Sequence, residues 1–111
     1  YMKFKIDDIG GEITKQDDRY IVKDNTTLKN LVVSSTKLKR NKSTTGHSHA
    51  GQEEVYYFIE GNGMMELGEE KFQVWPGDVV LIPDGVFHKV QALGDSGCYF
   101  VCVFDGTRGT K

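Results

Sequence analysis

Short apolar and β-branched segments alternate with polar residues through most of the chain, and none of them keeps a helical period over three turns. A period of two is typical of strands that bury one face. We therefore expect an all-β protein. The expected strands are approximately residues 20–23, 28–39, 54–60, 63–67, 71–75, 78–82, 87–92 and 98–104.

Turn residues separate nearly every pair of these segments. Residues 60–63 and 67–70 have the composition of tight hairpins, and residues 75–78 and 82–85 place proline and glycine where a strand must stop or bend. Short strands at such even spacing predict a sandwich, a jelly roll or a closed barrel. Because the chain has no linker or internal repeat, we expect one domain over residues 1–111, with a frayed tail at 107–111.

Composition and charge narrow the classes of partner. Apolar residues make up 38% of the chain and charged residues 27%, which argues against disorder, and no apolar run is long enough to span a membrane. The net charge is −2 and no stripe of lysine and arginine is present, so nucleic acid is not an expected partner. We expect a soluble globular protein that binds neither nucleic acid nor membrane.

The two cysteines, Cys98 and Cys102, would share one face of a strand at a separation too great for a direct disulfide. No signal-peptide pattern opens the sequence, in which Met2 is the expected natural start. Reduced thiols without a signal peptide predict a cytoplasmic location.

All three histidines fall in two segments of similar context, residues 46–49 and 85–88. On a strand, His47 and His49 would point to the same side, separated by about 6–7 Å of chain. Glu54 and His88 would complete a site if the fold brings their strands beside this segment. Three neutral imidazoles and a carboxylate suit Mn, Fe, Co, Ni, Cu or Zn, and not Ca or Mg. An octahedral ion with four protein ligands would keep two positions open.

The first histidine segment resembles a motif of the cupin family, which runs glycine, five residues, His-x-His, three or four residues, glutamate, six residues, glycine. The matching residues are His47, His49, Glu54 and Gly61. Glu53 also fits the shorter gap, but only Glu54 lies seven positions before Gly61. We therefore assign the ligand role to Glu54.

The second segment resembles the other motif of that family, which runs glycine, five residues, Pro-x-Gly, two residues, histidine, three residues, asparagine. It is matched by Gly77, Pro83, Gly85 and His88. The resemblance covers residues 46–92 and implies a double-stranded β-helix, the jelly-roll barrel of the cupins, with one divalent transition-metal ion inside. The ligands that it implies are His47, His49, Glu54 and His88.

Two residues depart from the family pattern. Asn41 stands in place of the first glycine, and Ala92 stands in place of the closing asparagine. Both lie outside the implied ligand set. We expect them to change the turn before the histidines and one hydrogen bond around the site, and to affect metal binding less.

Alternation along the strands predicts which side chains face the metal. If Glu54 points inward, Tyr56 and Phe58 share its face, while Val55, Tyr57 and Ile59 point outward. Val90 and Ala92 would follow His88 inward. On the last strand, Cys98, Phe100, Cys102 and Phe104 share one face, and the sequence does not say whether that face is inside.

Two kinds of site residue follow from this assignment. Tyr56 is the candidate catalytic residue, because its hydroxyl would be within reach of a molecule at the metal, as a hydrogen-bond donor or proton relay. The candidate substrate-binding residues are Phe58, Val90, Phe100 and Cys102.

Three functions are compatible with such a site. We favour an enzyme acting on a small oxygenated metabolite by isomerisation of a sugar or sugar phosphate, because small single-domain proteins with these motifs are grouped with the mannose-6-phosphate-isomerase-like cupins. Lys37, Lys39 and Arg40 are candidates for holding a phosphate. The alternatives are an iron- or manganese-dependent dioxygenase or decarboxylase, and a non-catalytic, metal-dependent module that binds a small ligand.

Apolar residues occupy both faces of residues 55–59 and 99–103, although a lone barrel should keep its outer face largely polar. Together with the resemblance to small cupins, this pattern predicts a homodimer.

Overall fold

The computed structural model describes residues 2–106 and is built from β-strands alone. Tyr1 and the tail 107–111, which the sequence predicts to be frayed, lie outside the described residues. The strands are β1 (Glu12–Gln16), β2 (Tyr20–Asn25), β3 (Leu31–Leu38), β4 (Glu54–Leu67), β5 (Glu70–Val74), β6 (Val79–Ile82) and β7 (His88–Asp105). No helix among the described residues is long and apolar enough to cross a membrane.

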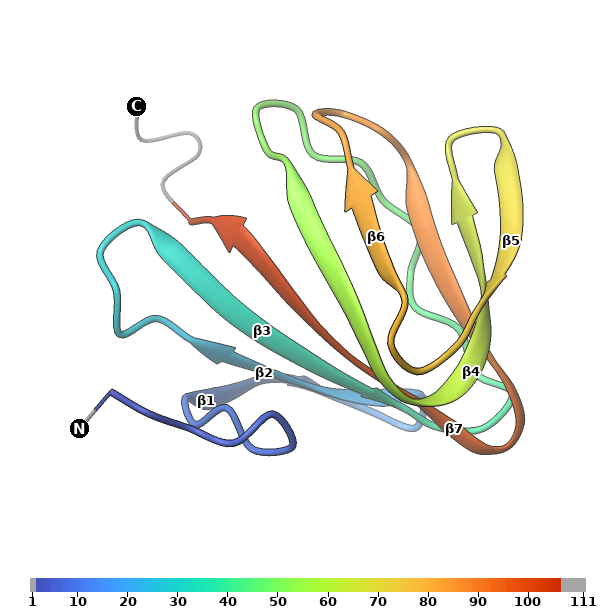
Figure 1. Cartoon of the computed structure of the whole chain (residues 1–111), viewed down its shortest axis with the longest axis horizontal. Helices are drawn as coiled ribbons and strands as arrows, with labels where there is room; N and C mark the ends of the chain where they lie inside the picture. The colour runs from blue at the N-terminus through green and yellow to red at the C-terminus, as the bar shows by residue number, and fades with distance from the viewer. Residues whose placement is uncertain (1, 107–111) are drawn as a thin grey trace.

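The two longest strands, β4 and β7, organise the fold. They pair antiparallel from Glu54↔Phe104 to Leu67↔His88, so each runs through both halves of the molecule. β3 pairs with the C-terminal part of β7 and continues the sheet to β2 and β1, while β5 and β6 pair with opposite ends of β4. Figure 1 shows the sheet bending along β4 and β7, which gives the antiparallel jelly roll expected from the sequence.

The predicted hairpin at residues 60–63 is wrong, because β4 continues through this segment, where its register with β7 shifts twice. Gly61 has φ 72°, and a Cβ there would collide with the carbonyl oxygen of Gly97 on β7. The glycine therefore permits a close approach of two strands within a bend. The hairpin at residues 67–70 is confirmed by the pairing of Leu67 with Glu70.

Two further strand boundaries differ from the sequence prediction. Residues 87–92 and 98–104, expected as separate strands, both belong to β7, which bends at residues 94–97, between its pairings with Asn62 and with Gly61 of β4 (Figure 1). β1 was not expected, because five residues that are all exposed carry no buried alternation. It forms the outer edge of the sheet beside β2.

The core fills the space between the two halves of the bent sheet. Its largest fully buried side chains are Phe58, Phe100, Leu38, Met65, Val74 and Val90. The inward facing predicted for β4 and for the start of β7 is confirmed. Along β7, the face that the sequence left undecided is the inner one, since Cys98, Phe100 and Cys102 are buried.

Candidate metal site

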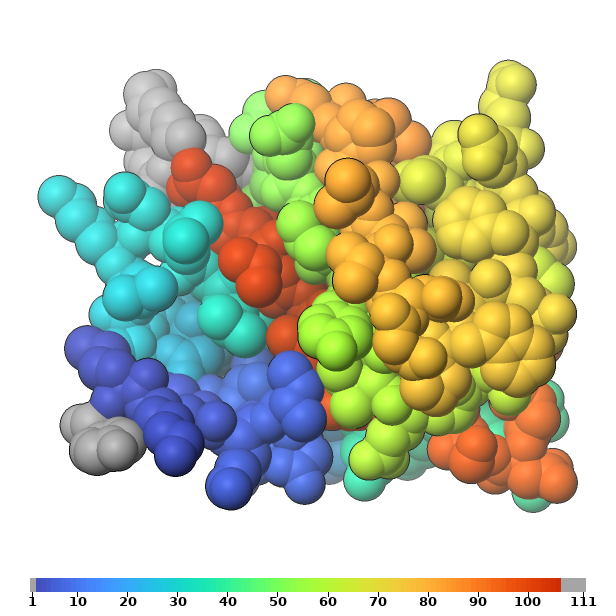
Figure 2. Space-filling model, viewed as in Figure 1, coloured from blue at the N-terminus to red at the C-terminus, as the bar shows by residue number. Residues whose placement is uncertain are grey.

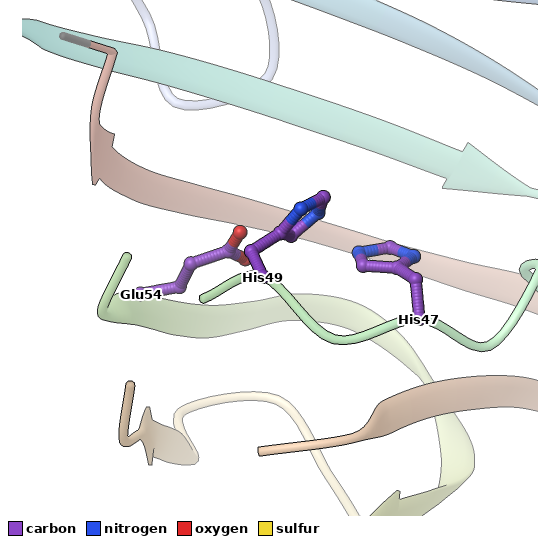
Figure 3. Close-up of side chains that lie close together, drawn as sticks. All are labelled: His47, His49 and Glu54. Atoms are coloured by element: carbon purple, nitrogen blue, oxygen red, sulfur yellow. The ribbon is translucent and has the colours of Figure 1, made fainter. Parts of the chain in front are cut away.

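Three potential ligands converge at one end of the jelly roll. His47 and His49 belong to the segment that precedes β4, Glu54 is the first residue of β4, and their ligand atoms all lie within 4.8 Å of one another. Figure 3 shows both imidazoles and the carboxylate on the same side of this segment. The sequence analysis treated this segment as a strand. In the structure it is a connection with one isolated bridge at His47.

That bridge joins His47 to His88, the fourth predicted ligand. The two residues are antiparallel partners, with the His47 N–H donating to the His88 carbonyl at 3.2 Å and the His88 N–H donating to the His47 carbonyl at 2.9 Å. Directly opposed residues of this kind have neighbouring side chains. Their ring centroids lie 4.4 Å apart, and the rings of His47 and His49 lie 4.5 Å apart.

Backbone carbonyls fix which nitrogen of two of the rings faces the site. Nδ1 of His47 lies 3.0 Å from the Thr45 carbonyl oxygen, and Nδ1 of His88 lies 3.0 Å from the Val86 carbonyl oxygen. A carbonyl oxygen can only accept, so each Nδ1 carries the proton and donates. The lone pair is left on Nε2, which is the arrangement found around histidine ligands of metals.

His88 supplies the test of whether these residues fit a metal ion. Its Nε2 is buried and has no hydrogen-bond partner among the described residues, and it lies 3.7 Å from Oε2 of Glu54. A buried lone pair without a donor is costly unless something else satisfies it. A cation held between this nitrogen, the other imidazoles and the Glu54 carboxylate would do so, and the donor set fits a divalent transition metal.

The electrostatic setting favours the neutral form of the His47 and His88 rings. Burial lowers the pKa of His88. Burial also lowers the pKa of His47, and the nearby His88 ring and the positive charge of Lys15 lower it further. Neutral imidazole is the form that binds a metal. The two rings therefore meet little competition from protons at neutral pH.

The turn before β7 holds the histidine segment in place. The Gly85 N–H donates to the His49 carbonyl at 3.1 Å, and the Gly51 N–H donates to Oδ1 of Asp84 at 2.7 Å. Gly46 is also required, because a Cβ there would collide with the Phe87 ring. The two sequence motifs are thus physically joined.

Three of the four candidate ligands, His47, His49 and Glu54, line a cavity of about 250 Å³. Its wall combines hydroxyl groups of Ser34, Thr36 and Thr44 with aromatic and thiol side chains of the inner face. Gln52, which is buried, also lines it and donates from Nε2 to the Asp105 carbonyl at 3.1 Å. The volume suits a molecule of a few heavy atoms.

The candidate catalytic and substrate residues fall in two groups. Tyr56, Phe100 and Cys102 line the cavity, whereas Phe58 and Val90 are not in its lining and pack in the core, each 1% exposed. Tyr56 stacks on Phe100 at 4.9 Å and meets the His88 ring edge to face at 5.6 Å. Burial, with Cys102 and Glu54 nearby, raises the pKa of Tyr56 well above its usual range, so its hydroxyl stays protonated.

Residues 35–104 match the family model described as a cupin domain. The chain belongs to the cupin family. Structural similarity agrees: KdgF from Halomonas sp. superposes with a TM-score of 0.77 at 22% identity, over 89% of each chain. At that identity the likeness concerns the fold.

Two curated relatives of this cupin match over part of their length. An uncharacterised protein of Methanocaldococcus jannaschii is 41% identical over 56 residues, which are 50% of this chain and 45% of the relative. The oxalate-binding protein of Thermotoga maritima is 28% identical over 67 residues, 60% of this chain and 55% of the relative. The chain therefore matches only about half the length of either relative.

The departures from the cupin motifs are accommodated by the fold. Asn41 has φ 60°, the left-handed conformation that the motif's glycine would adopt freely and that asparagine tolerates better than most residues. Ala92 is fully buried on the inner face of β7, and its N–H donates to the Lys42 carbonyl at 2.9 Å. Neither residue touches the ligand set.

Several residues at the cavity were not predicted. Lys15 and Thr14 reach it from β1, which the sequence did not reveal, and Thr45 acts through a backbone carbonyl that no side-chain pattern reports. The candidate phosphate contacts Lys37, Lys39 and Arg40 are exposed and do not line it.

Proposed function

We propose that this cupin is a divalent transition-metal protein, with the ion held by His47, His49, Glu54 and His88, and that it binds a small carboxylate-bearing metabolite in the adjoining cavity. The orphaned, buried Nε2 of His88 beside the Glu54 carboxylate is the observation that carries the proposal. The matching tautomer of His47 supports it, because both rings direct an unprotonated nitrogen away from their carbonyl partners.

A bound divalent ion would supply Lewis acidity and open coordination positions inside a partly apolar cavity. The chain's own residues then set which molecules fit. The cavity is small, its wall offers hydroxyl groups, and a basic side chain, Lys15, lies at its rim. The similarity to an oxalate-binding protein supports a carboxylate as the ligand.

Isomerisation of a sugar or sugar phosphate has less support. The predicted phosphate contacts Lys37, Lys39 and Arg40 do not line the cavity, although Lys15 does. A proton transfer would need a group such as Tyr56, which lines the cavity as a protonated donor. Tyr56→Phe keeps the ring packing and removes only the hydroxyl, so a proton-transfer role predicts lost turnover with unchanged ligand affinity.

Elemental analysis and calorimetry test the proposed function together. The purified protein should hold about one transition-metal ion per chain, and the loaded protein should bind short hydroxy or oxo acids more tightly than it binds neutral aldoses or ketoses. Ligand binding without turnover would make it a binding module, and turnover would make it an enzyme. Preferential binding of neutral sugars would contradict the proposal.

We also propose that the chain forms a homodimer through the outer face of β4, β6 and β7, the strands that lie side by side in Figure 2. Val55, Tyr57, Val79, Leu81 and Val103 are all exposed there and are neighbours across the paired strands. Contiguous apolar surface of this kind marks protein interfaces.

Light scattering at micromolar concentration tests the dimer. Leu81 is 67% exposed, so Leu81→Lys should separate the dimer without unfolding the subunit, whereas Leu28→Lys, at a 54% exposed site off this face, should not. A wild-type particle of 12.5 kDa would contradict the proposal.

A further inference from the structure

Lys15 on β1 (Glu12–Gln16) lies at the entrance to the cavity. It lines the cavity that contains Glu54 and Tyr56, and it also lines a hollow next to it that is shared by Arg19, Thr45, His47 and His49. A lysine at this point can reach a molecule whose other end lies among the proposed ligands. No residue of the cupin motifs occupies this position.

A β-bulge directs Lys15 toward the cavity. Ile13 pairs with Lys23 and Lys15 pairs with Val22, so β1 advances two residues while β2 advances one, and Thr14 is the extra residue. In a regular strand Lys15 would share the face of Ile13, which is 53% exposed and does not line the cavity. Bulges characteristically re-aim side chains in this way.

The neighbouring arginine does not compete for the same role. Arg19 Nη2 pairs with Oδ2 of Asp17 at 2.8 Å, its Nη1 donates to Thr45 Oγ1 at 2.8 Å, and its guanidinium lies 4.5 Å from the centre of the Tyr20 ring. Its charge is therefore neutralised and its position fixed. The side chain of Lys15 makes no hydrogen bond or ion pair with any residue from 2 to 106.

The balance of charge favours an anion. Apart from the histidines, the charged residues that line the cavity are Lys15, Asp24 and Glu54. A divalent ion at the proposed ligands would turn this lining from net negative to net positive. A ligand with two anionic ends would then meet the ion at one end and the ammonium group at the other.

We propose that Lys15 determines ligand specificity by binding a second, distal anionic group, a carboxylate or a phosphate, on the small carboxylate ligand. The inference rests on the proposed function, because it assumes that the first carboxylate lies beside the ion. Lys15 is not a catalytic residue in this account. It selects dianions over monoanions at the same site.

Calorimetry with three matched 2-hydroxy acids tests this role on the metal-loaded protein. Lactate has no distal charge, malate has a distal carboxylate and 3-phosphoglycerate has a distal phosphate. Wild type should bind malate, 3-phosphoglycerate or both about tenfold or more tightly than lactate, and the preferred acid identifies the distal group. Lys15→Met should remove the preference without changing lactate affinity, and Lys15→Arg should restore it.

Lys37→Met is the matched control, because Lys37 is exposed on β3 away from the cavity, and it should keep the preference. Equal affinity of wild type for lactate, malate and 3-phosphoglycerate would overturn the role of Lys15 and leave the proposed function standing. A preference that survives in Lys15→Met would also overturn the role of Lys15 alone. Failure of all three acids to bind the loaded wild type would overturn both.

Discussion

The inner face of β4 (Glu54–Leu67) changes character within five residues. At the metal end it carries Glu54 and then Tyr56, and one step further it carries Phe58, which is 1% exposed among core side chains. β7 repeats the change from its own end, where His88 is followed by Val90 and Ala92. Both regions lie inside one jelly roll, yet one is polar and opens to a cavity while the other is closely packed.

The difference shows that one end of the jelly roll stabilises the fold while the other carries the candidate site. The packed end stabilises the strands by burying apolar surface, and it does so without any ion. The other end, where we propose the metal site, holds the buried Nε2 of His88 without a hydrogen-bond partner among the described residues, and such an atom costs stability unless something satisfies it. Substitutions at the two ends should therefore affect different measurements.

The largest effect on folding should come from the packed end. Phe58→Ala removes a fully buried ring and should lower the free energy of unfolding of the metal-free protein by about 3–5 kcal/mol. Gln91→Ala, at an exposed position of β7, should change it by less than about 0.5 kcal/mol. Urea unfolding followed by circular dichroism measures both, and equal losses would remove the distinction between the two ends.

Metal removal should act on the other end. At a free ion concentration of about one hundred times the dissociation constant, the loaded protein should be more stable than the metal-free protein by about 2.7 kcal/mol. Thermal unfolding with and without a chelator measures this shift. The gain should disappear in His88→Gln, and a full gain in that variant would show that the ion binds elsewhere.

The cysteines sharpen the comparison, because Cys102 lines the cavity whereas Cys98 is buried in the core and is not part of the cavity lining. Burial raises the pKa of Cys98 to about 11 and that of Cys102 to about 12, the nearby Glu54 adding to the second shift. Since thiolate is the reactive form, both thiols should react with iodoacetamide at pH 8 at least about 100-fold more slowly in the folded than in the unfolded protein.

The same pKa shifts set a pH dependence. The folded state retains thiol protons that the unfolded state loses above about pH 8.5, so this stabilisation is complete below that pH and falls as pH rises toward the folded values. The free energy of unfolding, measured between pH 8 and 10, should fall accordingly.

Rapid alkylation of Cys102 in the native protein would contradict the slow alkylation predicted above and would show that the cavity admits solvent to the thiol.

The smallest effect should come from the turn before the histidines. Alanine tolerates the left-handed conformation at φ 60° less well than asparagine, so Asn41→Ala should lower the free energy of unfolding by about 1 kcal/mol. Glycine adopts this conformation freely, so Asn41→Gly should not show this loss. Metal affinity should stay constant in both variants, as titration calorimetry would report. A large loss of affinity would mean that this turn positions the ligands.

The sequence predicted the grouping of side chains better than the strand boundaries. The convergence of His47, His49 and Glu54, with His88 opposite His47, followed from residue type and spacing, and alternation placed Tyr56 and Phe58 on the correct face. That these residues bind a metal stays a prediction. That Cys98, Phe100 and Cys102 also face inward needed the pairing of β7 with β3 and β4, which is a long-range property.

What the sequence could not predict depends on backbone geometry. The glycine at 61 resembled a turn residue, but it permits a close contact of β4 with Gly97 on β7. All residues of β1 are exposed, so no buried alternation revealed this strand, and the bulge that directs Lys15 toward the cavity depends on the pairing of β1 with β2. The carbonyls of Thr45 and Val86 that set the histidine tautomers are common to every residue and leave no signature in sequence.

Titration of the metal-free protein with Co(II), followed by calorimetry and the visible spectrum, tests the metal site most directly. We predict one ion per wild-type chain. The affinity for Co(II) should fall more than about 100-fold in His47→Gln, which exceeds the usual effect of losing an outer hydrogen-bond partner. It should be unchanged in Ser48→Ala, whose side chain is exposed in the same segment. Equal Co(II) affinity in wild type and His47→Gln, or no binding in wild type, would contradict the account.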